Sequence, residues 1–262
     1  MKYIDSHCHL HDERIQGDIP GILARAEEAG VRYMVSCATM ESNFKRTRSL
    51  SREYGSILPC YGIHPWFLDS LSDRWEQVLG EQAAPEPCAI GETGLDFMDK
   101  AADRDKQIRV FRFHLELANT LGRPVNIHIR KAWDALIQIL KKSGPLKTPG
   151  LIHSYSGSAD LIPVLEKFNL YISFSGSVTR PNAKKVVKAV RAVSKDRILL
   201  ETDAPDIYPS LDEPAGSTPR LNEPANLVPI AGAAARIRGM NVEELAETAY
   251  DNSLKIFSPV LP

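Results

Sequence analysis

The stretch Ile4-Asp5-Ser6-His7-Cys8-His9-Leu10 is where the sequence first indicates both a fold and a chemistry. Its polar side chains Asp5, His7 and His9 recur at every second position. Successive side chains of a β-strand point to opposite faces, so this spacing predicts that the three share one face of a strand. Two imidazoles at a strand end can bind a metal ion when carboxylates and further imidazoles arrive from other segments. A histidine pair also occurs on surface strands, so the interpretation depends on the partners that the rest of the chain supplies.

Short segments rich in β-branched residues alternate along the chain with longer segments of helical period. We expect strands at residues 3–6, 33–37, 57–61, 88–91, 125–129, 150–153, 170–174 and 198–201. Gly30 and Gly122 mark the ends of two intervening helices. Eight strand–helix units in 262 residues predict a (β/α)₈ TIM barrel, an α/β fold forming a single domain over residues 1–262. The alternative is an open doubly wound sheet, but no GxGxxG or phosphate-loop motif follows the first strand.

The composition is that of a soluble globular protein, with 43% hydrophobic and 25% charged residues. With 32 basic and 33 acidic residues the net charge is −1, so any contact with nucleic acid has to be local. No apolar run approaches the ~20 residues of a membrane span, and no basic, apolar leader precedes Asp5. Four cysteines are scattered without a CxxC pair, which indicates reduced, buried thiols. We therefore expect a cytoplasmic protein without a membrane partner.

The active site of a TIM barrel lies at the carboxyl ends of its strands. In chain order, the polar residues expected at these ends are His7, His9, His64, Glu92, His128, His153 and Asp203. Five of the seven histidines in the chain and two carboxylates are thus predicted to meet at one rim. This combination of imidazole and carboxylate donors indicates a metal centre.

The number of ligands predicts two metal ions rather than one. Four imidazoles and two carboxylates exceed one tetrahedral shell but suit two cations ~3.5–4 Å apart that share a carboxylate. One cation is assigned to His7, His9, Glu92 and Asp203, and the other to Glu92, His128 and His153. Nitrogen and oxygen donors suit Zn, Mn, Co or Fe and are compatible with Mg, so the identity of the metal stays open. Asp5 is expected to orient an imidazole by accepting its second hydrogen bond.

Three residues near the metal ligands are expected to bind substrate. His64 and Arg130 are the expected phosphate contacts, because Arg130 shares the strand parity of His128 and guanidinium binds phosphate oxygens through paired hydrogen bonds. Ser156 opens a Ser-Gly-Ser segment before a helix whose first amides could hold an anion, although a plain helix cap fits equally well. Two divalent cations outweigh Glu92, Asp203 and one hydroxide by about one positive charge, which favours an anionic substrate.

Two further stretches bear on the substrate. Residues 204–224 contain five prolines and little periodicity, so we expect a long loop on the ligand rim that shapes the substrate site. The basic residues between 184 and 197 alternate with valines at helical spacing and are interpreted as a solvated helix face rather than a DNA-binding surface. His11 is interpreted as a loop residue and His114 as part of a buried helix stripe, so neither is assigned to the site.

At this point the chain resembles the TatD-type metal-dependent hydrolases, often called TatD-type DNases. The resemblance runs from Asp5 to about residue 257 and rests on the motifs DSHCHL (5–10), GIHP (62–65), GETGLD (91–96), NIHIR (126–130), HSYSG (153–157), FSG (174–176), ETDAP (201–205) and NEP (222–224). It implies a TIM barrel with two divalent cations, phosphoester hydrolysis, and metal-dependent cleavage of DNA, commonly from a 3′ end. The metal residues of the family fall on His7, His9, Glu92, His128, His153 and Asp203.

The leading hypothesis is therefore a two-metal phosphodiesterase, a deoxyribonuclease of 3′-exonuclease character. A metal-bound hydroxide would attack the phosphorus, with Asp203 as catalytic base and Glu92 as the shared ligand. The substrate would be DNA or a small phosphate-bearing molecule. The family often has a basic Gly-Lys-Arg-like stretch before Asn-Glu-Pro, whereas residues 216–221 read Gly-Ser-Thr-Pro-Arg-Leu here, which weakens the expectation of a polynucleotide.

Three other functions are weighed against this hypothesis. An amidohydrolase acting on a small amide, lactone or phosphate ester usually bridges its metals with a carboxylated lysine, and no lysine lies near Glu92. A PHP-type phosphoesterase needs further histidine ligands late in the chain, and none follows His153. A metal-binding scaffold without catalysis would be expected to have lost one of the ligands.

Overall fold

The computed structural model describes residues 1–211 and 221–262. Eight strands form one parallel sheet in which each strand pairs with the next in the chain. The strands are β1 (Tyr3–Cys8), β2 (Val31–Cys37), β3 (Ile57–Tyr61), β4 (Ala89–Asp96), β5 (Val125–Arg130), β6 (Gly150–Ile152), β7 (Leu170–Phe174) and β8 (Ile198–Leu200). This sequential parallel order confirms the predicted TIM barrel. The largest difference from the expected strands is in β4, which continues as far as Asp96 rather than ending at residue 91.

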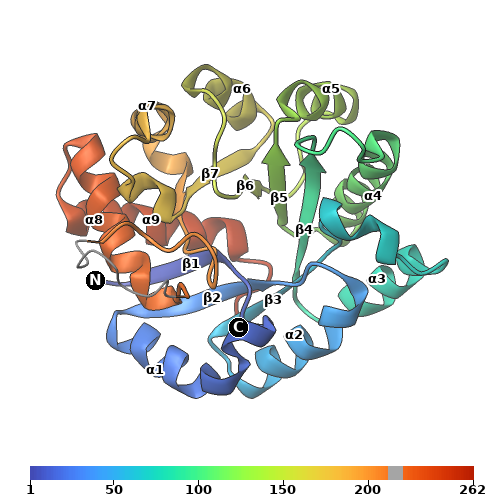
Figure 1. Cartoon of the computed structure of the whole chain (residues 1–262), viewed down its shortest axis with the longest axis horizontal. Helices are drawn as coiled ribbons and strands as arrows, with labels where there is room; N and C mark the ends of the chain where they lie inside the picture. The colour runs from blue at the N-terminus through green and yellow to red at the C-terminus, as the bar shows by residue number, and fades with distance from the viewer. Residues whose placement is uncertain (212–220) are drawn as a thin grey trace.

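Helices surround the strands in chain order, as Figure 1 shows. The α-helices are α1 (Ile19–Glu28), α2 (Glu41–Glu53), α3 (Trp75–Ala83), α4 (Arg104–Leu121), α5 (Trp133–Ser143), α6 (Ile162–Lys167), α7 (Lys184–Ala192), α8 (Leu227–Arg238) and α9 (Val242–Phe257). Short 3₁₀ helices occupy η1 (Glu13–Asp18), η2 (Pro65–Ser70), η3 (Ala159–Leu161), η4 (Gly176–Thr179), η5 (Lys195–Arg197) and η6 (Pro224–Asn226). Helix α4 begins where the Asp103 carboxylate accepts a hydrogen bond from the Lys106 amide and ends at Gly122, whose φ of 64° is left-handed.

The first and last strands meet through hydrogen bonds that place two predicted ligands side by side. The Ser6 hydroxyl donates to the Leu200 carbonyl over 3.0 Å. Just beyond the strand ends, the Asp203 amide donates to the His7 carbonyl over 3.0 Å and the His9 amide to the Ala204 carbonyl over 2.7 Å. The segment after β8 is thereby held against the segment after β1.

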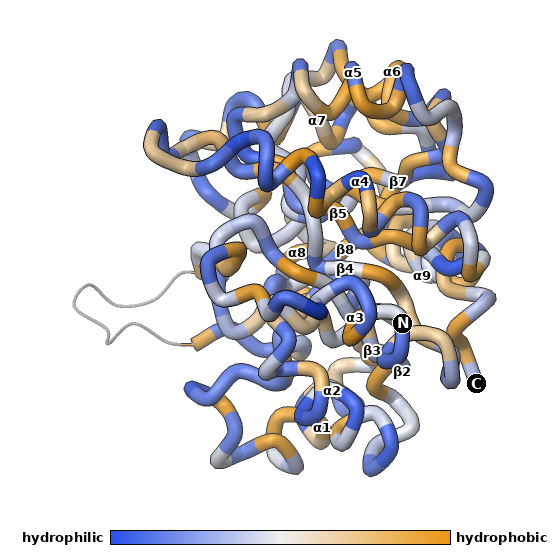
Figure 2. Tube along the Cα trace, turned by 90° about the vertical axis from the view of Figure 1, so that its right-hand side faces the viewer, coloured by the Kyte–Doolittle hydropathy of each residue, from blue (hydrophilic) through white to orange (hydrophobic). Residues whose placement is uncertain are grey.

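The amino ends of the strands are filled by apolar side chains. One cluster joins residues from seven strands, including Ile4, Leu58 and Leu199 near the starts of theirs, to Phe257 at the end of α9. Helix α9 packs against β1 and β8, and both chain ends lie on the same side of the molecule in Figure 2. Towards the carboxyl ends the buried residues become polar, so the apolar end supports a polar site at the opposite end.

Two expectations drawn from composition can be compared with the structure. The four cysteines are free and buried, as predicted. In the described parts of the chain, no helix combines the length and apolar character that a membrane crossing requires.

Candidate metal centre

The structure brings together the six side chains that the sequence assigned to metal binding. They converge on Glu92 in the middle of β4, with His7 from β1, His9 just after it, His128 from β5, and His153 and Asp203 from the ends of β6 and β8. All six except His7 line a cavity of about 710 Å³, and His7 lies fully buried beneath it. His64, which follows β3, lines the same cavity.

Four ligand atoms form the first group. The Nε2 atoms of His7 and His9 are 3.1 Å apart. Asp203 Oδ1 lies 3.4 Å from the first and 3.3 Å from the second. Glu92 Oε2 lies 3.5 Å and 3.4 Å from the same two nitrogens. Donor atoms ~2.1 Å from a tetrahedral cation are ~3.4 Å from one another, so this spacing matches a metal shell.

The hydrogen-bond partners of Nδ1 in His7 and His9 show which ring nitrogen bears the lone pair. His7 Nδ1 lies 2.8 Å from the Asn126 side-chain oxygen, and His9 Nδ1 lies 2.8 Å from the Cys37 carbonyl oxygen. Each oxygen accepts a hydrogen bond, so in the neutral rings Nδ1 bears the proton and Nε2 the lone pair. Two lone pairs and two carboxylate oxygens then face one another without a hydrogen between them. Neutral rings therefore suit a cation at this point, whereas protonated rings would donate hydrogen bonds to the carboxylates instead.

The second group is built on the other oxygen of Glu92. Glu92 Oε1 lies 3.1 Å from His128 Nδ1 and 2.9 Å from His153 Nε2, and these two nitrogens are 3.1 Å apart. His128 Nε2 donates to Asp96 Oδ2 over 3.3 Å, which leaves the Nδ1 lone pair facing Glu92. His153 Nδ1 faces the buried carboxylate of Glu201 at 3.5 Å. Glu92 thus offers one oxygen to each group.

An irregularity in β4 places Glu92 at the centre. The pairing of β4 with β5 shifts register between Ile90 and Thr93. Gly91 has a φ of 137°, and a Cβ there would lie 2.4 Å from the Asn126 carbonyl oxygen. Only glycine allows the two strands to approach this closely, which explains the Gly-Glu pair of the sequence.

The charges in the centre are strongly coupled. Burial alone would raise the pKa of Glu92, but His64, His153 and His7 hold it well below its usual range. Burial would also raise the pKa of Asp203, whereas hydrogen bonds from His7 and His9 keep it well below the usual value. For His153, burial and His7 lower the pKa, yet Glu92 and Glu201 raise it to about 9. The ionised carboxylates therefore draw positive charge onto the surrounding imidazoles, which is the charge that a bound cation supplies.

His64 differs from the other four histidines. Its Nδ1 accepts a hydrogen bond from the Trp66 amide over 3.2 Å, so the proton of the neutral ring is on Nε2, 3.4 Å from Glu92 Oε1. Burial lowers the pKa of His64 to about 3, so the ring is neutral at pH 7. Although His64 lies within ligand distance of Glu92 and His128, it presents a hydrogen-bond donor rather than a lone pair.

The cavity above the ligands contains the other predicted substrate contacts. Arg130 and Ser156 both line it, together with Arg14, Tyr155 and Arg180. The helix after Ser156 consists of a three-residue 3₁₀ turn and a six-residue α6, so the structure gives little support to an anion site at its amino end. Arg14 is paired with Asp12 and Asp206, which line the same cavity, so Arg130 and Arg180 are the cationic side chains that this wall can offer to an anion.

The expectation for Asp5 is wrong. Its carboxylate accepts hydrogen bonds from the Thr202 amide, over 2.9 Å, and from the Thr202 hydroxyl, and it reaches no imidazole. The pairing explains why: Asp5 is opposite Met34 and Cys8 is opposite Ser36, so β1 has one residue more than β2 in this interval. The bulge shifts the alternation, and Asp5 does not share the face of His7 and His9.

The residues that orient the ligands were missed by the sequence argument. Asn126 holds His7, and its amide nitrogen donates to the Ser6 carbonyl over 3.0 Å, which fixes its own orientation. Asp96 orients His128 and also accepts a hydrogen bond from the Trp66 indole over 2.8 Å. The signal was available as strand parity, because Asn126 is two residues before His128 and Asp96 is four after Glu92.

The long loop after β8 is partly described. Asp206 and Ile207 line the cavity, which places this part of the loop on the ligand rim as expected. Arg14 joins the segments after β1 and β8, since its guanidinium donates to Asp12 and to Asp206 over 2.8–2.9 Å. Residues 212–220, which include most of the stretch that departs from the family pattern, lie outside the described residues.

The structure also shows where the residues lie that the sequence argument did not assign to the site. Lys184, Lys185 and Lys188 are exposed on α7, as expected for a solvated face. His114 is buried in α4, where its Nε2 accepts a hydrogen bond from the Ile63 amide. His11 lies in the loop between β1 and η1, as expected, but it is buried and lines the cavity from which the sequence argument had excluded it.

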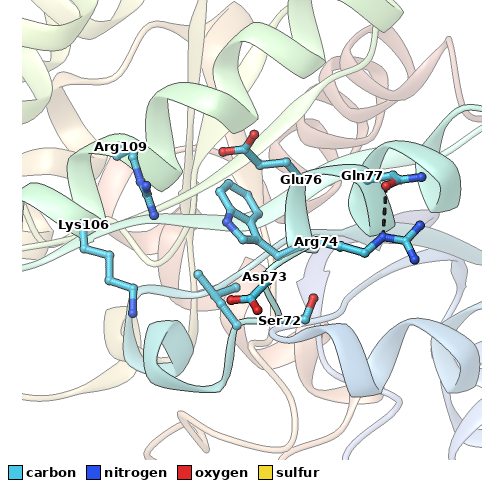
Figure 3. A pocket seen from close by; sticks show the side chains of 9 residues that line it. Ser72, Asp73, Arg74, Glu76, Gln77, Lys106 and Arg109 are labelled. Carbon is cyan, nitrogen blue, oxygen red and sulfur yellow. Dashed lines mark hydrogen bonds between the residues drawn. The ribbon is translucent and has the colours of Figure 1, made fainter.

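A second cavity of about 540 Å³ lies outside the metal centre. It is lined by residues 71–77, Lys106 and Arg109. Figure 3 shows acidic and basic side chains interspersed around it, with Arg74 hydrogen-bonded to Gln77. None of the clustered metal-ligand candidates in the described chain borders it, so the candidate metal centre is associated with the first cavity alone.

The comparisons with known proteins agree with this geometry. A family model described as TatD related DNase matches residues 4–258. The uncharacterized metal-dependent hydrolase YabD of Bacillus subtilis is 32% identical over 254 residues, which cover 97% of this chain and 98% of the relative. The deoxyribonuclease TATDN3 of Homo sapiens is 30% identical over 97% of this chain and 94% of its own. The crystal structure of YJJV, a TatD homologue from Escherichia coli K12, superposes with a TM-score of 0.89 at 28% identity and covers 98% of both chains.

Proposed function

This chain belongs to the TatD-related DNase family, and on that premise we propose that it is a metal-dependent phosphodiesterase that removes nucleotides from DNA, as a 3′-exonuclease. The observation that supports the proposal best is the convergence of lone pairs and carboxylate oxygens on two sides of Glu92. Names of relatives support the same reading, since YabD is called a metal-dependent hydrolase and TATDN3 a deoxyribonuclease.

The donor set supports a proposal of two divalent cations. His7, His9, Glu92 and Asp203 would hold one, and Glu92, His128 and His153 the other, with Mg, Mn or Zn as candidate metals. When bound, two such cations lower the pKa of a water molecule from 15.7 toward ~7 and neutralise phosphate charge.

The residues of the chain supply the remaining steps. Asp203, ionised and exposed to the cavity, accepts the proton of the attacking water and passes it toward the leaving oxygen. His64 donates its Nε2 proton to a phosphate oxygen, and Arg130 binds the same phosphate or the next one through its guanidinium. Ser156 offers its hydroxyl at the cavity edge.

An amidohydrolase acting on a small amide, lactone or phosphate ester is the alternative. Against it, no lysine is among the described residues that line the cavity, so the carboxylated lysine typical of such two-metal sites has no source there. Arg130 and Arg180 on the cavity wall favour an anionic substrate instead. The free, buried cysteines support the proposed cytoplasmic location.

A nuclease assay tests the proposal. Single-stranded DNA labelled at its 5′ end is incubated with the purified protein and Mg²⁺, Mn²⁺ or Zn²⁺, and the products are resolved on a sequencing gel. Shortening by one nucleotide at a time from the 3′ end supports the proposal. Intact DNA with every cation, together with turnover of an amide or lactone panel, would establish the alternative.

A further inference from the structure

One large aromatic side chain on the wall of the candidate metal cavity is mostly exposed to solvent. Trp66 is 63% exposed, the largest exposed fraction among the large hydrophobic side chains in the described chain. It is the second residue of η2, which begins immediately after His64. Exposing an indole to water is unfavourable, and an exposed aromatic on a cavity wall is typical of a surface that is covered by a ligand.

Trp66 is held in one orientation despite its exposure. Its indole nitrogen donates to Asp96 Oδ2 over 2.8 Å, and Asp96 is itself buried and bonded to His128 and to the Met98 amide. The indole also makes T-shaped contacts with two imidazoles, the His64 ring 4.8 Å away at 83° and the His128 ring 6.2 Å away at 67°. The indole is therefore fixed before any ligand binds, so little conformational entropy is lost when one covers it.

From this arrangement we infer that Trp66 is a stacking platform for a nucleobase next to the scissile phosphate. The inference rests on the proposed function, because the base is brought to Trp66 only when its phosphate lies at the metal centre. Indole stacking tolerates any base, since every base has an aromatic face. It requires a base whose face is free, which excludes an intact internal base pair and selects an unpaired end.

Trp66 would thus determine specificity rather than take part in the chemistry. It contacts the base, whereas His64 and Arg130 would contact phosphate. A substrate without a base next to the phosphate loses the stacking and keeps the phosphate contacts. The ratio of affinities for a normal and an abasic strand end therefore isolates the contribution of Trp66.

The experiment compares two proteins on three strands, one normal and two abasic. The metal-loaded wild type and Trp66→Ala are titrated with fluorescein-labelled single strands that end in a normal nucleotide or in an abasic residue, and binding is measured by fluorescence anisotropy. Terminal phosphorothioate linkages slow cleavage during the titration, and the abasic residue is placed last in one strand and second to last in another. We expect the wild type to bind the normal strand roughly tenfold to a hundredfold more tightly than one of the abasic strands. Trp66→Ala should bind all of them with similar, weak affinity.

Two further variants separate stacking from structure. Trp66→Phe keeps an aromatic face but lacks the hydrogen bond to Asp96, so it should retain most of the discrimination between normal and abasic ends. Met98→Ala removes another exposed apolar side chain, 47% exposed and outside the cavity lining, and should behave like the wild type. If Trp66→Phe resembled Trp66→Ala, the indole would act only through Asp96 and the stacking role would be wrong.

The outcomes also distinguish this inference from the proposed function. A wild type that shortens DNA while Trp66→Ala keeps the wild-type ratio of normal to abasic affinity overturns the role of Trp66 and leaves the nuclease proposal intact. A wild type that neither binds nor shortens any strand overturns both, and this is recognised in the wild type alone. Circular dichroism and metal content of each variant establish that it is folded and loaded.

Discussion

The histidines around Glu92 differ in which ring nitrogen bears the proton. His7 and His9 each use Nδ1 for an oxygen acceptor and turn Nε2 to the carboxylates, whereas His64 accepts at Nδ1 and turns a proton toward Glu92. Under the proposed function, the five histidines at one rim divide into four candidate metal ligands and one donor to substrate. The division depends on what lies behind each ring, because that partner selects the tautomer.

The role proposed for Asp203 gives a prediction at this scale. Asp203→Asn keeps an oxygen for the metal but removes the charged proton acceptor, so kcat should fall by about 10²- to 10⁴-fold while the fold is kept. Steady-state cleavage of a single strand, with metal content measured on the same samples, checks this. Asp196→Asn, at an exposed position in η5, is the matched control and should keep wild-type kcat. A rate within a few-fold of wild type in Asp203→Asn would exclude it as the base.

At the scale of residues, the candidate ligands at strand ends could be predicted from the sequence. The residues that orient those ligands could not be predicted in the same way. His7 and His128 lie near the ends of their strands and Asp203 follows β8, and position at a strand end is visible in the pattern of the sequence. Asn126 acts across the barrel on His7, and Asp96 acts on His128 of the neighbouring strand, so both partners are far away in the chain. Trp66 lies in a short 3₁₀ helix, and so short a segment has no hydrophobic period from which the direction of its side chains could be predicted.

At the scale of elements, helix α4 supports the loop that carries His64. His114 is buried in α4, its Nδ1 bonds to the Val110 carbonyl, and its Nε2 accepts from the Ile63 amide next to His64. The neutral ring is required for this pair of bonds. Burial lowers the pKa of His114 to about 4, although the Val110 carbonyl opposes the shift.

The low pKa of His114 makes the stability of the protein depend on pH. Between about pH 4 and 6.5 the unfolded chain binds a proton at this residue and the folded one does not, so the free energy of unfolding falls as pH falls through that window. From pH 7 to pH 5 the loss attributable to His114 is on the order of 2 kcal/mol. Urea unfolding at both pH values, with chelator present to remove effects of metal, measures it.

His114→Gln is the matched variant, because glutamine can donate and accept in the same directions but does not titrate. Other buried histidines titrate equally in both proteins, so the difference between the two pH dependences isolates His114. Equal losses in wild type and His114→Gln would contradict the assignment.

The apolar patterns of the sequence predicted the strands but not their irregularities. All eight strands were predictable because each is a short apolar run between helical segments. The bulge in β1 was not, since an extra residue leaves the composition of a strand unchanged while it turns Asp5 away from His7 and His9. The end of β4 was also placed too early, because Thr93, Gly94 and Asp96 do not resemble a buried strand until their partners on β5 are known.

For the whole molecule, the centre is a junction of strands that are distant in the chain. Ligands from β1, β4, β5 and from the ends of β6 and β8 meet at one point, so the unfolded chain cannot reproduce the site. Metal binding should therefore stabilise the folded state, by about 2.7 kcal/mol when free metal is a hundredfold above Kd.

Metal removal tests this coupling between site and fold. Thermal unfolding in Mn²⁺ and in chelator should differ by roughly 5–10 °C in Tm for a chain of this size. Glu92→Ala should show a much smaller difference, because the shared ligand is missing. An equal shift in both proteins would mean that the ions act elsewhere on the surface.

The most direct test of the central claim is the number of metal ions bound per chain, measured by mass spectrometry after dialysis against Mn²⁺ or Zn²⁺. The wild type should hold two, and Glu92→Ala at most one, because one carboxylate serves both groups of ligands. Glu244→Ala, which removes a carboxylate from an exposed ion pair with Lys195, should hold two like the wild type. Two ions in Glu92→Ala, or a single ion in a fully loaded wild type, would contradict a pair of cations joined through Glu92.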